Sequence, residues 1–206
     1  MLRDLVRGGM IVDDASLVLL INSLNHTVAP TRVGPEAYVR LIAAELDERH
    51  FFGLYAKIWL FSKYGTPAEL LSLMARTQQL WTADYRLGRL VGGLRPLFVK
   101  SPQMDAATRI VALSRNTGAR ETWRFHQQLS SDPAAFSKMS QALKSPNTSK
   151  STGTTHAKYM LILSALGNRA VARSQRDALV NANKAVWKDF FYRRWARNTL
   201  GLRRFP

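Results

Sequence analysis

The stretch TPAELLSLM at residues 66–74 contains the pattern that decides the fold class. Thr66 can cap a helix, Pro67 suits the first helical position, and Glu69 stands where a capping box places its acidic residue. The apolar residues that follow have the three- and four-residue spacing of one helix face: Leu70, Leu71 and Met74. The stretch therefore predicts an amphipathic helix that starts at Pro67.

Three other segments resemble the one that starts at residue 68 (AELLSLMART). Each opens with alanine and continues with aliphatic residues at helical spacing: AYVRLIAAEL from 37, AATRIVALSR from 106 and AKYMLILSAL from 157. The four starts are 31, 38 and 51 residues apart, and the first two intervals are typical of helix-pair repeats. We therefore expect an all-α protein in which antiparallel helix pairs stack as a short α-solenoid, closed by a long basic C-terminal helix.

Glycine, proline and polar residues divide the chain into helix-sized pieces. Helices are predicted near 14–25, 35–48, 52–63, 103–115, 119–130, 132–143, 156–166 and 169–197. Breaks are expected at Gly65, Gly92-Gly93, Pro96, Gly118 and Pro133. The polar segment KSPNTSKSTGTT predicts a flexible basic loop at 144–155. It separates an expected helical-repeat domain at 1–143 from a basic helical hairpin and tail at 156–206.

Positive charge is concentrated in one half of the chain. Residues 1–100 contain 12 Lys and Arg against 9 Asp and Glu, whereas residues 101–206 contain 18 against 5, within a total net charge of +16. Such an excess needs an anionic partner, and the phosphate backbone of a nucleic acid is the commonest one. The chain has no cysteine and no apolar run of the about 18 residues that a membrane span needs.

The last predicted helix is the main candidate for RNA binding. Its basic face and the following tail supply the expected contacts: Arg169, Arg173, Arg176, Lys184, Lys188, Arg193, Arg194, Trp195, Arg197, Arg203 and Arg204. Arginine binds phosphates in a bidentate manner, and aromatic rings stack on unpaired bases. The spacing of Trp187, Phe190, Phe191 and Trp195 fits a packed core as well. A second basic group, at Arg109, Arg115, Arg120 and Arg124, could extend the same surface.

Patterns that indicate catalysis or metal binding are scarce. The four histidines are scattered and lack the spacing of metal ligands. The acidic group at Glu45, Asp47 and Glu48, beside His50, is interpreted as the solvated end of a helix. We therefore expect a non-enzymatic protein with no cofactor and no metal.

Two stretches carry a family resemblance. The segment GMIVDDASLVLLIN at 9–22 and the segment AYVRLI at 37–42 resemble helix starts of pentatricopeptide repeats. The chain thus resembles a diverged helical-repeat protein of the pentatricopeptide/tetratricopeptide type. That resemblance implies RNA metabolism or translation in an organelle, most often the mitochondrion. Val18 and Val39 occupy the position where the family usually has Asn, Thr or Ser, which indicates binding of shape and phosphate rather than base reading.

These observations favour an RNA-binding component of a mitochondrial ribonucleoprotein, such as the mitoribosome or an RNA-processing or translation factor. In that setting the near-neutral N-terminal half would contact other proteins of the assembly. If the protein is not mitochondrial, we expect it in the cytoplasm. Two rival hypotheses stay open: a viral nucleocapsid or coat protein that packages RNA, and an adaptor whose helical repeats bind a protein.

Overall fold

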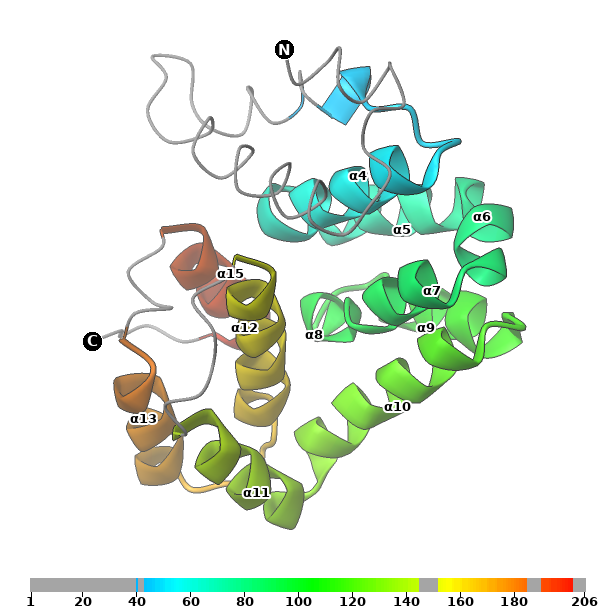
Figure 1. Cartoon of the computed structure of the whole chain (residues 1–206). Coiled ribbons are helices and arrows are strands. Elements are labelled where there is room, and N and C mark those ends of the chain that lie inside the picture. The colour runs from blue at the N-terminus through cyan, green and yellow to red at the C-terminus, as the bar shows by residue number, and fades with distance from the viewer. Residues whose placement is uncertain (1–39, 41–42, 145–151, 185–189, 202–206) are drawn as a thin grey trace.

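The computed structural model describes residues 40, 43–144, 152–184 and 190–201, and within these ranges the protein is all-α without strands. The predicted fold class is confirmed. The elements, shown in Figure 1, are α4 (Phe51–Tyr64), α5 (Pro67–Arg76), α6 (Gln78–Ala83), α7 (Tyr85–Gly92), α8 (Arg95–Phe98), α9 (Met104–Leu113), α10 (Thr117–Ser131), α11 (Pro133–Lys144), α12 (Thr152–Leu166), α13 (Arg173–Ala182) and α15 (Phe190–Leu200). The helix expected near 14–25 lies outside the described residues. Half of the helix expected near 35–48 is described, and its residues 40 and 43–45 are helical.

The start of α5 is the capping box that the sequence predicts. The Thr66 hydroxyl accepts a hydrogen bond from the backbone N–H of Glu69 at 3.2 Å, and the Glu69 carboxylate accepts one from the Thr66 N–H at 2.8 Å. Leu70, Leu73 and Met74 form the buried face of this helix. The predicted start of α5 is confirmed, and so are Leu70 and Met74 of the predicted apolar face. Leu73 is buried in place of Leu71, which is half-buried.

Helices α7 and α10 pack closely because small residues line their contact. A Cβ added to Gly88 would lie 2.1 Å from the side-chain oxygen of Asn116, and one added to Gly92 would lie 2.4 Å from the carbonyl oxygen of Ala119. A side chain at Gly88 would displace the Asn116 side chain, and one at Gly92 would require movement of the α10 backbone. The two glycines, four residues apart on α7, thus determine how near α10 approaches.

Asn116 joins this helix pair to the end of α6. Its side chain is buried and caps α10 by accepting a hydrogen bond from the N–H of Ala119 at 3.0 Å. Its amide group donates to the carbonyl oxygens of Trp81 (3.0 Å), Thr82 (3.2 Å) and Asp84 (2.9 Å). One side chain therefore satisfies backbone groups at the end of α6, at the start of α7 and at the start of α10.

The C-terminal helices pack back on the earlier ones. Helix α12 contacts α8, α10 and α11, and α15 contacts α12, α8 and α4. A single hydrophobic core cluster extends from Leu54 on α4 to Ala196 on α15. Helix pairs in a solenoid contact mainly their sequence neighbours, whereas α15 and α4 are distant in sequence. The predicted solenoid arrangement is therefore not confirmed.

Several predicted boundaries are wrong. Gly118 lies inside α10, and Pro96 lies in the first turn of α8, where proline is compatible with a helix. Helix α12 begins at Thr152, inside the loop expected at 144–155. The expected breaks at Gly65 and Gly93 are confirmed, since these residues are the C-caps of α4 and α7. Within the described part of the chain, no helix combines the length and the apolar character needed to cross a membrane.

Candidate nucleic-acid interface

The single basic helix expected at 169–197 is broken. Helix α13 ends at Ala182, and Asn183, which is 3% exposed, is its C-cap with φ −119° and ψ 34°. The Asn183 side-chain amide donates to the carbonyl oxygen of Leu179 at 2.8 Å. Arg169 lies in the turn before α13 and Lys184 lies beyond its end. The prediction that these two residues share one continuous helical face with Arg173 and Arg176 is therefore wrong.

The candidates in and around α13 have different environments. Arg169 is exposed and its side chain has no partner within the described chain, whereas Arg173 pairs with Asp177 at 3.9 Å. The Arg176 guanidinium donates to the carbonyl oxygen of Asn168 in the turn after α12. Arg176 therefore links α13 to that turn, and its guanidinium is less available to a ligand than that of Arg169. Lys188 lies outside the described residues.

Helix α15 carries the next group of candidates. Arg197 is exposed, and Arg193 is half-buried with its Nε atom buried and unpartnered. The backbone of Arg194 and Trp195 lies in this helix, and their side chains are not described. Lys100 donates to the carbonyl oxygen of Leu200 at 3.2 Å and so holds the end of α15 against the α8–α9 turn. Arg203 and Arg204 lie outside the described residues.

Most of the described cationic side chains of the second half have no partner among the described residues. Eight Lys and Arg side chains form no hydrogen bond and no ion pair with any described residue: Arg109, Arg115, Arg120, Arg124, Lys138, Arg169, Lys184 and Arg197. Seven of them are exposed, and Arg120 is half-buried. Their donors therefore face water and are open to an anionic partner.

The acids of the first half, in contrast, hold cations. Glu48 pairs with Arg76 at 2.9 Å and with Lys57 at 3.1 Å, and Asp84 pairs with Arg86 at 3.3 Å. The hydrogen bond from Arg76 is the main cause that lowers the pKa of Glu48. The acidic group follows the helical residues 43–45, where Glu45 is exposed, and Glu48 in addition connects this segment to α4 and α5.

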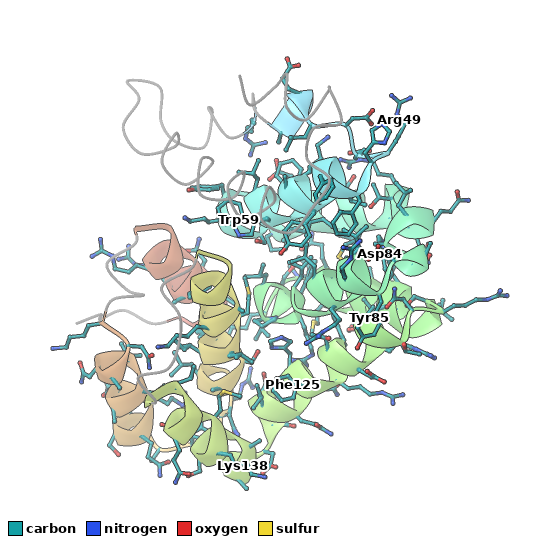
Figure 2. The ribbon with its side chains drawn as sticks, in the orientation of Figure 1. Arg49, Trp59, Asp84, Tyr85, Phe125 and Lys138 are labelled. Carbon is teal, nitrogen blue, oxygen red and sulfur yellow. The ribbon has the colours of Figure 1, made fainter. Side chains whose placement is uncertain are left out.

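Two exposed aromatic rings near the second basic group escaped the sequence analysis. Phe125 on α10 is 41% exposed, and Tyr85 at the start of α7 is 53% exposed. The guanidinium of Arg89 lies 5.9 Å from the centre of the Tyr85 ring. Figure 2 shows the two rings at different points along the α7–α10 pair. On a helical wheel of α10, Phe125 falls at the edge of the buried stripe, about 20° from Gly118 and about 40° from Leu129, so the sequence pattern does not reveal its exposure.

A buried polar group lies next to Phe125 on α10, with the Phe125 and His126 ring centres 5.7 Å apart in an edge-on contact. His126 is 4% exposed, and its Nδ1 shares a hydrogen bond with the hydroxyl of Ser164 on α12. Burial, reinforced by the positive charge of Arg95, lowers the pKa of His126 to about 4. His126 is therefore neutral at pH 7 and joins α10 to α12. The described residues contain no group of acids and histidines arranged to hold a metal ion.

Comparisons with known proteins add no relative. No family model, no curated protein and no solved structure matches the chain. The resemblance to helical-repeat proteins therefore stays a prediction, and the function has to be inferred from the residues themselves.

Proposed function

We propose that this protein binds RNA without catalysing a reaction, as a component of a larger ribonucleoprotein. The observation that carries the proposal is the set of eight cations without partners, described above, in a chain of net charge +16. Arginine and lysine heads that are not held by carboxylates can replace the counterions around phosphates, and the release of those ions drives binding. The resemblance to organellar repeat proteins suggests the mitochondrion as the compartment.

The arrangement of charge suggests how such a component would be oriented. The first half uses its acids in internal pairs such as Glu48–Arg76 and Asp84–Arg86 and carries a small net charge. The second half presents unpaired cations on α9, α10, α11, the α12–α13 turn and α15. In this proposal the second half faces the RNA, and the first half contacts neighbouring proteins.

The proposal is tested by fluorescence anisotropy with a labelled single-stranded RNA at near-physiological salt. The full chain is compared with a variant in which the predicted tail contacts Arg193, Arg194, Arg197, Arg203 and Arg204 are alanine. We expect submicromolar binding by the full chain and at least tenfold weaker binding by the variant, with unchanged helical content by circular dichroism. An absence of binding by the well-folded full chain would overturn the proposal and favour the protein adaptor.

A further inference from the structure

Helix α10 presents a cationic row to solvent. Its buried side contains Ala119, Trp123 and His126, which pack toward the core. Arg120 and Arg124 are about 40° apart around the helix axis and lie on the side away from these residues. Neither guanidinium has a hydrogen bond or an ion pair with the described chain. Figure 1 shows α10 along an outer edge of the molecule, without a further helix beyond it in that view.

The neighbourhood of this row is also basic. Arg115 immediately precedes α10 in the turn from α9, and Arg109 is exposed on α9, which packs against α10. Asp105 and Glu121 are the acids that α9 and α10 contain. Four arginines therefore share this region with two acids, and none of the four is paired within the described structure.

Two exposed aromatic rings lie on the adjoining side of α10. The Tyr85 ring covers the first turn of α10, because a Cβ on Gly118 would lie 2.8 Å from two of its ring carbons. Gly118 and Phe125 are seven residues apart and therefore lie on nearly the same side of α10, separated by about 10 Å along the axis. Tyr85 and Phe125 consequently mark a second track on α10, and Phe125 lies about 100° around the helix axis from Arg124, with the exposed Glu121 between them. Both rings are substantially exposed, which leaves aromatic surface available for stacking.

From this juxtaposition we propose that single-stranded RNA lies along the outer face of α10. Its phosphates contact Arg120 and Arg124, and an unpaired base stacks on Phe125. This assignment rests on the proposed function and adds the surface and the form of the RNA. Only unpaired bases offer free faces to an aromatic side chain, so the rings favour a single strand over a duplex. An acidic protein segment would neutralise the arginines but would not require the ring of Phe125.

Two kinds of variant separate the phosphate contacts from the stacking contact. In Arg120→Gln/Arg124→Gln, two phosphate contacts are lost, so the slope of log affinity against log salt should become shallower by about 1.4. In Phe125→Leu, the apolar bulk is kept and the aromatic ring is lost, so affinity should fall about tenfold with an unchanged salt slope. All three positions are at least partly exposed, and thermal melts of the variants check that the fold is retained.

A matched control has the same loss of charge on other elements. Lys138→Gln/Arg169→Gln removes two unpaired cations from α11 and from the α12–α13 turn, and Figure 2 places Lys138 on α11, away from Tyr85. We expect this control to weaken RNA binding less than Arg120→Gln/Arg124→Gln does. A poly-glutamate competitor, added at the same concentration of negative charges as an unlabelled RNA competitor, tests for an acidic protein partner. It should displace the labelled RNA poorly.

The results that would overturn the α10 assignment differ from those that would overturn RNA binding by this protein. Failure of the unaltered chain to bind RNA overturns both proposals. Tight RNA binding that the α10 variants leave intact, or that the control weakens more, overturns the α10 assignment alone. An unaffected Phe125→Leu variant together with efficient displacement by poly-glutamate would identify the face as a site for an acidic protein.

Discussion

Replacement of Gly88 by alanine tests the account of the α7–α10 contact in the most detail. The three atoms nearest to the added Cβ are all side-chain atoms of Asn116, at 2.1, 2.2 and 2.4 Å. The Asn116 side chain must therefore move, and it loses its bonds to the α6–α7 carbonyls and its cap on α10. The lost cap costs about 1 kcal/mol, and the buried groups left unsatisfied cost about 2 kcal/mol more. Alanine returns about 1 kcal/mol through its higher helix propensity.

The expected net effect of Gly88→Ala is thus a loss of about 2 kcal/mol in the free energy of unfolding, within the 5–15 kcal/mol typical of folded proteins. In an Asn116→Ala background the obstructing side chain is gone, so the same substitution should be neutral or stabilise by up to about 1 kcal/mol. Urea unfolding at pH 7, followed by circular dichroism, measures all four corners of this double-mutant cycle.

Gly92→Ala is the matched control for this cycle. Its Cβ would lie 2.4 Å from the backbone carbonyl oxygen of Ala119, which the Asn116→Ala substitution does not remove. Its cost should therefore be similar in both backgrounds. If Gly88→Ala costs the same with and without the Asn116 side chain, the proposed steric reasoning is refuted.

Two further predictions concern stability. The pKa of His126 is about 4 in the folded protein and about 6.5 when unfolded, so the unfolded state binds more protons between these values and stability falls as pH decreases through this window. We expect this group to make the free energy of unfolding about 2 kcal/mol lower at pH 5 than at pH 7, as measured by urea unfolding. A His126→Gln variant should lack this part of the pH dependence. Equal pH dependence in the two proteins would contradict the prediction. Thr66→Ala removes the cap of α5 and should cost about 1 kcal/mol, whereas Thr66→Ser should cost much less; thermal unfolding distinguishes the two variants, and equal losses would argue against the capping role.

Local signals in the sequence predict some elements well. The start of α5 follows from Thr66 and Glu69, which interact with each other and with the backbone between them. The ends of α4 and α7 follow from Gly65 and Gly93 in the same way. In each case the residues that determine the boundary lie within a few positions of it, so a local pattern contains the necessary information.

Features that depend on distant contacts could not be predicted. Gly118 is expected to break a helix, yet it lies in the first turn of α10, where the Tyr85 ring occupies the space that a side chain would need. At the end of α13, the Asn183 side chain donates a hydrogen bond to the backbone carbonyl of Leu179 and so competes with the helical backbone for this acceptor. The spacing of the basic residues does not reveal this competition. Arg176 has the periodicity of a solvent-facing residue, but its guanidinium binds the Asn168 carbonyl.

In the candidate site, too, some features follow from local sequence and others depend on distant contacts. Composition predicts the excess of positive charge, and the spacing of Arg109, Arg115, Arg120 and Arg124 predicts a second basic group. The pairing of acids with cations in the first half depends on contacts such as Glu48–Arg76, 28 residues apart. The exposure of Tyr85 beside α10 likewise depends on how α7 packs. Charge could therefore be predicted from sequence, whereas the surface that combines charge with aromatic rings required the fold.

The central claim is that this chain binds RNA through unpaired cations, and the salt dependence of its affinity for a single-stranded RNA tests that claim most directly. Eight phosphate contacts at about 0.7 counterions each predict a slope of log affinity against log salt of about −6. A slope near this value would support the account. A slope shallower than about −1, or no binding at near-physiological salt by the folded chain, would contradict it.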